Sequence, residues 1–276
     1  MARLRVYPLK GAAGFDLPES DLDQFGIPGD RRWMLATPDG CFISQRTHPR
    51  LCLIRTSPAA GGGGYRALRF TLNAPGMEAF ELTPTPSQTW TEVRLHKDRF
   101  SVLVGYSGAD RWFTRFLGDS CRLVFIPEEV RRPTDPEWAP GHRVGLADGY
   151  PLHLTTEESL RDMNRRLSRD TSMLRYRPNL VVAGGEPWEE DVWRVLEIGG
   201  IKVRLVKPCA RCAVTTVDPG SAVRGREPLR SMKAFREWEG KVYFGQNAVY
   251  EGSGGFRVGD DVRILETGSR RPPVFT

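Results

Sequence analysis

Two cysteines near residue 210 are the residues of this sequence whose types and spacing could do chemistry. Cys209 and Cys212 stand three apart in the stretch VKPCARCAVTTVDPG, residues 206–220, with Arg211 between them. Such a pair can supply half of a zinc site, a redox-active dithiol, or one thiolate ligand for a softer metal. Cysteines can also pack as small hydrophobic side chains. The chemistry of the chain depends on which of these four roles the pair performs.

The residues around the pair argue against two of these roles. A structural zinc site needs four ligands, whereas the other three cysteines and the four histidines are scattered along the chain. A thioredoxin-like pair lies at the start of a helix, whereas the residues after Cys212 are β-branched and lead into a Pro-Gly turn. Packed cysteines and a single metal-bound thiolate remain. Arg211 could pair with the anionic part of a cofactor, and spacing alone leaves this choice open.

Length and charge narrow the classes of partner. The chain has 276 residues with 39% hydrophobic side chains, which is enough for a sizeable core in one large or two modest domains. Its net charge of +6 is scattered and forms no basic stripe with interleaved aromatic residues. We therefore expect no nucleic-acid partner, and an anionic small molecule suits the charge distribution better.

The same composition indicates a location. No run of 18 apolar residues is present, so we expect no membrane span. The first residues, MARLRVYPLKGAAGF, lack the apolar segment of a signal peptide. Five cysteines are an odd number, which argues against a disulfide framework. These features predict a cytoplasmic protein.

The elements that must position the cysteine pair are mostly short strands. Strand patterns occur at residues 3–9 and 91–105, around an Asp39-Gly40 turn, and in a hairpin about Gly199-Gly200 that leads into the pair. Helices are predicted at residues 108–118, after Thr155 or Thr156, and at residues 227–237. Residues 61–64 are predicted to be a loop tip. The pattern favours a mainly β fold of the α+β class, with a β-barrel core and peripheral helices.

Long ordered motifs make the chain similar to the MOSC family. The motifs RPNLVV, VLEIGGIKVRLVKPCARCAVTTVDPG, GREPLRSMKAFR and FGQNAVYEGSGGFRVGDDVRIL strongly resemble the MOSC domain, named for the C-terminal part of molybdenum-cofactor sulfurase. VYPLKGAAG, GIPGDRRWML and FISQRTHPRLCLI resemble the β-barrel domain that precedes MOSC in many members, so the whole resembles the amidoxime-reducing components. On this resemblance we expect an N-terminal β-rich MOSC-associated domain at residues 1–118, a MOSC domain with a β-barrel core at 119–267, and a C-terminal tail at 268–276.

The resemblance also implies a molybdenum cofactor, in which a pyranopterin dithiolene and one protein thiolate hold molybdenum. In the family the second cysteine of the pair is the ligand, which is Cys212 here, whereas Cys209 would be a packed thiol. Gly11 stands where some relatives have serine, so a hydroxyl contact would be lost there. The residues expected to bind the cofactor are Lys10, Gly11, Arg31, Thr156, Arg177, Asn179, Ala210, Arg211 and Cys212.

On the same resemblance, the activity would be the reduction of N-hydroxylated compounds such as amidoximes, hydroxamic acids and hydroxylamines, by two-electron oxygen removal at molybdenum. The chain lacks the four cysteines of an appended ferredoxin domain, so electrons would come from a separate ferredoxin-, flavodoxin- or cytochrome b5-like protein. An alternative stays open. The protein could carry the molybdenum cofactor, or sulfur as a persulfide, without turnover of its own.

Overall fold

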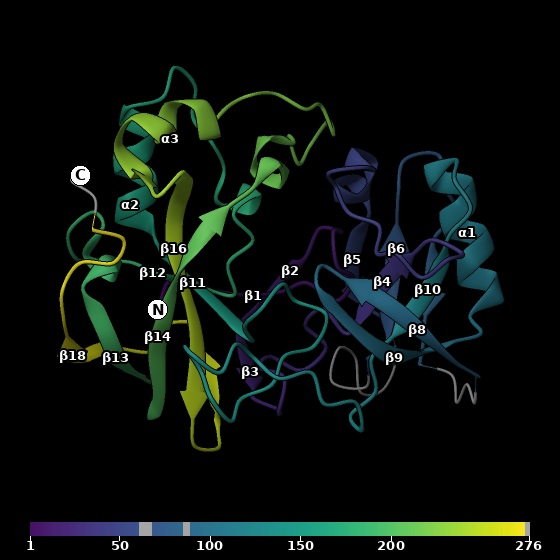
Figure 1. Ribbon diagram of the computed structural model, residues 1–276, viewed down its shortest axis with the longest axis horizontal. Helices are drawn as coiled ribbons and strands as arrows, with labels where there is room; N and C mark the ends of the chain where they lie inside the picture. The colour runs from purple at the N-terminus through teal and green to yellow at the C-terminus, as the bar shows by residue number, and fades with distance from the viewer. Residues whose placement is uncertain (61–67, 85–88, 274–276) are drawn as a thin grey trace.

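Short strands dominate the chain, as the sequence predicts (Figure 1). A computed structural model describes residues 1–60, 68–84 and 89–273. The predicted loop tip at residues 61–64 and the last three residues of the predicted tail lie outside these ranges. The α-helices of the described residues are α1 (Ser107–Leu117), α2 (Glu157–Arg165) and α3 (Leu229–Arg236).

The largest sheet has nine strands and combines the C-terminal half of the chain with its first two strands. β1 pairs antiparallel with β12, placing Leu4 opposite Leu180. The start of the chain is therefore built into the sheet that carries the cysteine pair. In spatial order the strands are β18 (Val262–Thr267), β13 (Trp193–Ile198), β14 (Ile201–Arg211), β16 (Lys241–Glu251), β11 (Leu152–Thr156), β12 (Leu180–Val182), β1 (Arg3–Val6) and β2 (Phe15–Leu17), with β15 (Glu237–Trp238) paired to β16.

The N-terminal half contributes smaller sheets, which occupy the other side of the molecule in Figure 1. One sheet has the order β4 (Trp33–Ala36), β10 (Arg122–Phe125), β9 (Asp98–Val104), β8 (Thr89–Leu95). Another has the order β5 (Arg55–Pro58), β6 (Phe70–Asn73), β7 (Phe80–Leu82), and β3 (Glu19–Asp21) pairs with β17 (Gly255–Arg257). Within the described ranges these sheets have open ends and do not close into a complete barrel. The division of the chain at residues 118 and 119 stays a prediction.

Glycines with positive φ angles lie at several of the predicted ends of strands and helices. The β13–β14 hairpin turns through Gly199 and Gly200, whose φ angles of 56° and 80° suit glycine best. α1 ends at Gly118, which has a φ of 84°, as the sequence predicts. The Asp39-Gly40 turn also forms, but its second strand does not pair fully with β4. The chain leaves toward β8 after the turn, where Cys41 bridges Arg94.

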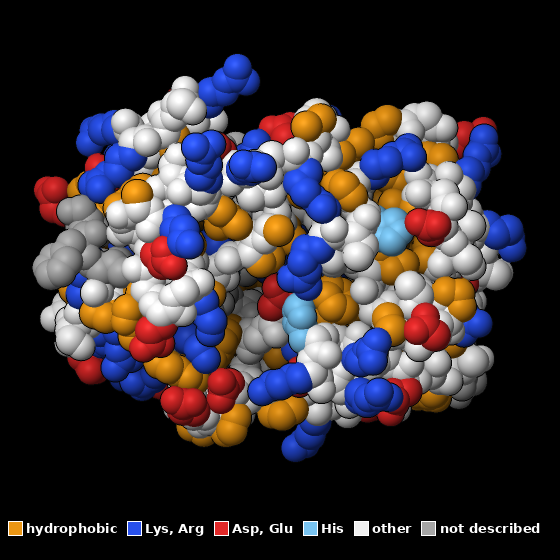
Figure 2. All heavy atoms as spheres, turned by 45° about the horizontal axis from the view of Figure 1, so that its top comes forward, with side chains coloured by type: hydrophobic (Ala, Val, Ile, Leu, Met, Phe, Trp, Pro, Cys, Tyr) orange, Lys and Arg blue, Asp and Glu red, His pale blue; other side chains and the backbone are white. Residues whose placement is uncertain are grey.

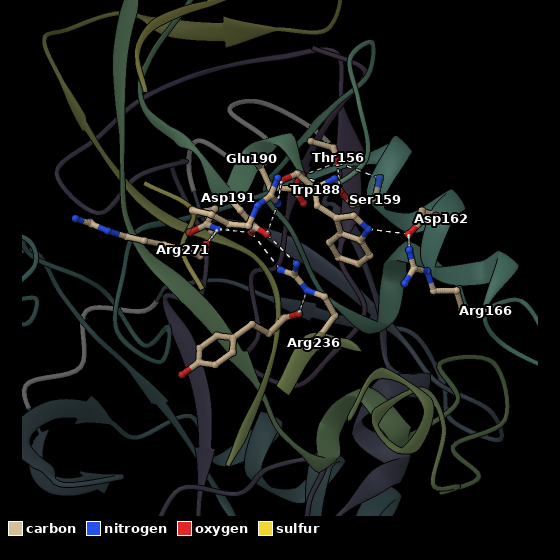
Figure 3. A network of polar contacts seen from close by, with 12 residues as sticks. Thr156, Ser159, Asp162, Arg166, Trp188, Glu190, Asp191, Arg236 and Arg271 are labelled. Carbon is tan, nitrogen blue, oxygen red and sulfur yellow. Dashed lines mark hydrogen bonds and ion pairs between the residues drawn. The ribbon is translucent and has the colours of Figure 1, made fainter. Parts of the chain in front are cut away.

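A buried ion pair connects three elements near the end of the nine-stranded sheet (Figure 3). Arg236 of α3 contacts Asp191 at 2.8 Å, and both side chains are fully buried. Gln246 of β16 donates to the same carboxylate at 3.0 Å, and Arg236 also donates to the Tyr243 carbonyl at 3.1 Å. Since Arg236 and Asp191 are paired with each other and make further hydrogen bonds, they can fix how α3 packs on β16.

Replacing Arg236 by Gln should lower the free energy of unfolding by about 3–5 kcal/mol, because Asp191 would keep a buried charge that its remaining partners only partly compensate. Urea denaturation followed by circular dichroism measures this change. The matched control is Arg263→Gln, which removes an exposed pair with Glu197 at 2.7 Å and should change stability by less than about 1 kcal/mol. Equal effects of the two substitutions would contradict this role of the buried pair.

Candidate functional site

A cavity of about 150 Å³ has walls from both halves of the chain. The turn after β1 contributes one wall, and β11, the segment before β12 and the end of β14 contribute the others. Sequence motifs that are far apart in the chain therefore meet at one place. Six of the predicted cofactor-binding residues line this cavity, namely Lys10, Gly11, Arg31, Arg177, Asn179 and Arg211.

The turn after β1 is held against β4. The backbone N–H of Lys10 donates to the Trp33 carbonyl at 2.8 Å, and Gly11 has a φ of 89°. A Cβ at Gly11 would lie 3.1 Å from Leu51, so glycine suits both the conformation and the space. The Lys10 ammonium donates to Asp148, and burial lowers the pKa of Lys10 against the attraction of that carboxylate.

Arg31 and Asn179 are joined by hydrogen bonds that fix the orientation of both side chains. The Arg31 guanidinium donates to Asp30 at 2.6 Å, to the Asn179 side-chain oxygen at 3.0 Å and to the Arg177 carbonyl at 3.0 Å. Asn179 is 1% exposed and donates to the Arg5 carbonyl at 3.1 Å. Asn179 therefore positions Arg31 at the cavity wall.

Arg177 carries a half-buried positive charge that forms no ion pair with an acidic side chain among the described residues. One of its nitrogens donates to the Ala12 carbonyl, whereas Nη2 is buried and has no hydrogen-bond partner among the described residues. Burial, followed by repulsion from Arg31, lowers the pKa of Arg177 to about 10. The left-handed backbone of Arg177, with a φ of 55°, adds local strain. Such a group favours an anionic ligand.

Arg211 contributes a second partly unpaired guanidinium from the end of β14. It donates to the Cys209 sulfur at 2.8 Å and to the Tyr176 carbonyl at 2.8 Å, and its Nε is buried without a partner in the described chain. His153 of β11 lies 3.4 Å from Arg211. Burial and then the charges of Arg211 and Arg31 hold the pKa of His153 well below its usual value, so the imidazole is neutral.

The two cysteines and Ala210 differ in their relation to the cavity. Side chains alternate along a strand, so Cys209 and Arg211 line the cavity whereas Ala210 is exposed and does not. Cys212 lies just beyond β14, is half-buried, and stands between the lining residues Arg211 and Val214 without lining the cavity itself. Burial raises the pKa of the Cys209 thiol, which favours its protonated form.

Thr156 lies outside the cavity wall. It is 2% exposed and caps α2, where its hydroxyl oxygen accepts from the Ser159 N–H at 3.2 Å. The same hydroxyl donates to Glu190 at 3.1 Å, and the Ser159 hydroxyl donates to Glu190 at 2.7 Å (Figure 3). Thr156 is therefore engaged in helix capping and in the buried network around Asp191.

Sequence reasoning missed several polar residues of the cavity, among them Arg46, Asp148, His153, and Cys209 in its lining role. Asp148 lies in a long polar segment between the two halves, and its pairing with Lys10 joins positions 138 residues apart. His153 follows an apolar residue in a strand pattern, which also fits a packed histidine. Only the alternation along β14, which places Cys209 on the side of Arg211, was a usable signal in the sequence.

The donor set fits an anionic cofactor. Lys10, Arg31, Arg177 and Arg211 line the cavity together, whereas Asp148 is the acidic residue among the described lining residues. Two buried guanidinium nitrogens, on Arg177 and Arg211, have no hydrogen-bond acceptor among the described residues. Lys and Arg side chains are also spread over the face shown in Figure 2. A phosphate-bearing cofactor would supply the missing acceptors.

Comparison with known proteins identifies the family. Residues 1–120 match the family model of the MOSC N-terminal beta barrel domain, and residues 141–263 match that of the MOSC domain. Mitochondrial amidoxime reducing component 2 of Rattus norvegicus is 33% identical over 95% of this chain and 82% of its own length. Mitochondrial amidoxime-reducing component 1 of Homo sapiens is 33% identical over 96% and 82%. The chain belongs to the MOSC family, in the group of the amidoxime-reducing components.

A third relative is itself named for the molybdenum cofactor. Molybdenum cofactor sulfurase of Solanum lycopersicum is 27% identical over 98% of this chain and 36% of its own length. Among solved structures, YiiM from Geobacillus stearothermophilus is 16% identical with a TM-score of 0.32 over 42% of this chain and 55% of its own. Among the described residues, no helix is both long enough and apolar enough to cross a membrane. A cytoplasmic location stays a prediction, since the amidoxime-reducing relatives are named mitochondrial.

Stability should depend on pH through Glu190. Burial and then the Asp191 charge raise the pKa of Glu190 from 4.5 to about 7. Between these values the folded protein holds a proton that the unfolded chain has released, so the free energy of unfolding falls as pH rises through this window and levels off above about 7. Urea denaturation from about pH 4 to pH 8 measures this fall.

The control is Glu190→Gln, whose side chain can still accept from Thr156 and Ser159. The stability of the wild type relative to this variant should fall as pH rises toward about 7 and stay constant above it, because the variant lacks the proton that Glu190 loses in this window. A difference that is constant across the range would show that Glu190 has an ordinary pKa.

Proposed function

We propose that this protein is a molybdenum-cofactor-dependent reductase of N-hydroxylated compounds. The observation that supports it best is the meeting of Lys10, Arg31, Arg177 and Arg211 in one cavity beside the segment that carries Cys212. Four cations from distant parts of the chain, with buried donors left over, suit a large anion that must be held firmly. The relatives named for amidoxime reduction, at 33% identity, support the reaction class.

The residues of the chain have separate roles in this proposal. Lys10 and Arg31 bind the cofactor phosphate, and Asn179 orients Arg31 through the bond at 3.0 Å. Arg177 lies against the pterin with its unpaired Nη2. Arg211 offers its free Nε to the pterin side of the cofactor. The Cys212 thiolate is the protein ligand to molybdenum, because a soft ligand suits a metal already bound to sulfur. Ala210 supplies backbone next to these groups, and Thr156 acts only through α2.

When bound, the cofactor supplies two-electron redox chemistry. The overall reaction consumes two electrons and two protons, breaks the N–O bond of the N-hydroxyl group, and releases the amine or amidine with one water. The electrons come from a separate donor protein of the ferredoxin, flavodoxin or cytochrome b5 kind. The buried guanidinium groups hold the anion, and burial of the cavity wall limits access of water to it.

A second function is supported by the sulfurase relative, which covers 98% of this chain. In this alternative the same cations hold the molybdenum cofactor for delivery, or Cys212 carries a persulfide. The distinguishing experiment measures molybdenum and pterin in the purified protein and the turnover of benzamidoxime with a chemical reductant. Metal and pterin without turnover support the carrier, and one zinc per chain would exclude both functions.

Cys212→Ala should lower benzamidoxime turnover by at least about 100-fold and reduce molybdenum content, because the metal loses its protein ligand. Cys209→Ala is the matched control, since Cys209 lines the cavity and accepts from Arg211. It should stay within about tenfold of the wild-type rate and keep its molybdenum. Loss of molybdenum in Cys209→Ala with retention in Cys212→Ala would reverse the assignment of the two thiols.

A further inference from the structure

A larger cavity of about 610 Å³ adjoins the candidate cofactor site, and the roles proposed above leave it without an occupant. Its walls come from the segment after β1, from β5 and β6, from the residues before β12, and from the turn after η5 (Ala213–Thr216). Gln45, Arg177 and Val214 line both cavities. η5 begins directly after Cys212, so a molecule in the larger cavity would lie close to that thiol.

The lining of this cavity is strongly one-sided in charge. Arg5, Arg55, Arg175 and Arg177 line it, and none of the described lining residues is acidic. Asp16 and Asp218 engage Arg5 and Arg175 from outside the lining, at 2.7 and 2.8 Å. The buried contact of Arg177 is instead a carbonyl oxygen, and Arg55 stands exposed on β5. Positive charge is thus left for a ligand.

Three buried polar atoms in this lining have no hydrogen-bond partner among the described residues. They are the Tyr7 hydroxyl, Arg5 Nε and Arg177 Nη2. Tyr7 is 1% exposed, and the guanidinium groups of Arg177 and Arg31 lie 4.3 and 4.6 Å from its ring centroid. Buried donors without acceptors are uncommon in folded proteins. An anionic oxygen in the cavity would be an acceptor for the Tyr7 hydroxyl and Arg5 Nε, whereas Arg177 is engaged by the cofactor in the proposed function.

The rest of the lining is mostly apolar. It includes Leu53, Pro75, Leu174, Val214 and Val217. Leu174 is 37% exposed and adds apolar surface to the wall. A cavity with apolar walls and a few convergent cations suits a small organic acid better than an inorganic anion.

We propose that this larger cavity is the substrate site and that it selects N-hydroxylated substrates carrying a carboxylate on an apolar, ring-sized body. The apolar walls would bind the ring, and Arg55 and Arg5 with the Tyr7 hydroxyl would bind the carboxylate. The N-hydroxyl group would then face the segment of Cys212. This inference deepens the proposed function and rests on it for the reaction, whereas the preference for an anion can be tested by binding alone.

The experiment compares 4-carboxybenzamidoxime with benzamidoxime, which lacks the carboxylate. Calorimetric titration of the purified full-length protein should give about tenfold tighter binding of the carboxylate compound, and kcat/KM should favour it by a similar ratio. Arg55→Gln should reduce both ratios to about threefold, mainly through Kd and KM, because Arg5 and the Tyr7 hydroxyl remain. Arg55→Lys keeps the charge and should restore most of the preference.

Arg99→Gln is the matched control, because Arg99 is an exposed strand arginine of the same half, paired with Glu92 at 3.1 Å. It should leave both ratios at the wild-type value. Equal affinity of the wild type for the two compounds overturns the inference, as does an unchanged ratio in Arg55→Gln. Loss of pterin from Arg55→Gln would show instead that the larger cavity holds the cofactor.

The two proposals fail separately. Absence of molybdenum and of turnover in the wild-type protein would reject the proposed function, while the calorimetric ratio would still decide whether the cavity selects a carboxylate. Normal molybdenum content and turnover with no preference between the two compounds would reject only the substrate class.

Discussion

The structure depends on the burial of like charges around Tyr7. Arg31 and Arg177 both lie over its ring, and the Arg31 guanidinium donates to the Arg177 carbonyl at 3.0 Å. Bringing two guanidinium groups together away from water is unfavourable unless an acceptor neutralises them. Asp30 serves Arg31 in this way at 2.6 Å, whereas Arg177 bonds to a carbonyl. Arg177 therefore keeps a positive charge that forms no ion pair with an acidic side chain among the described residues.

These arginines lie where the two halves of the chain are joined. β1 belongs to the nine-stranded sheet, and the turn that follows it brings Lys10 next to Asp148. The same sheet delivers His153 from β11 and Arg211 from β14. Most of the cations lie outside the strands: Lys10, Arg31 and Arg177 are in turns and connecting segments, whereas Arg211 ends β14. Hydrogen bonds to neighbouring elements, such as that from the Lys10 N–H to the Trp33 carbonyl at 2.8 Å, hold these segments in place.

Local signals in the sequence predict much of this arrangement, and pairings between distant residues supply the rest. Glycine at 118 and at 199–200 predicts the end of a helix and a tight hairpin turn, because these positions need positive φ angles. Both α1 and the β13–β14 hairpin form as expected. No local pattern reveals that β1 pairs with β12, because alternation shows a strand but not its neighbour. The role of Thr156 was equally hidden in the sequence, because the same hydroxyl can cap a helix or contact a ligand. Convergence of the arginines is visible only in three dimensions.

The pairing of Leu4 with Leu180 also bears on how the protein matures. The first strand leaves the ribosome early, yet its neighbour in the sheet is made only when about two thirds of the chain has been translated. The turn carrying Lys10 cannot reach its final position before then. A cofactor bound by Lys10 and Arg211 together could accordingly be held only after β14 has been made, because a shorter nascent fragment would offer it only scattered, solvated cations.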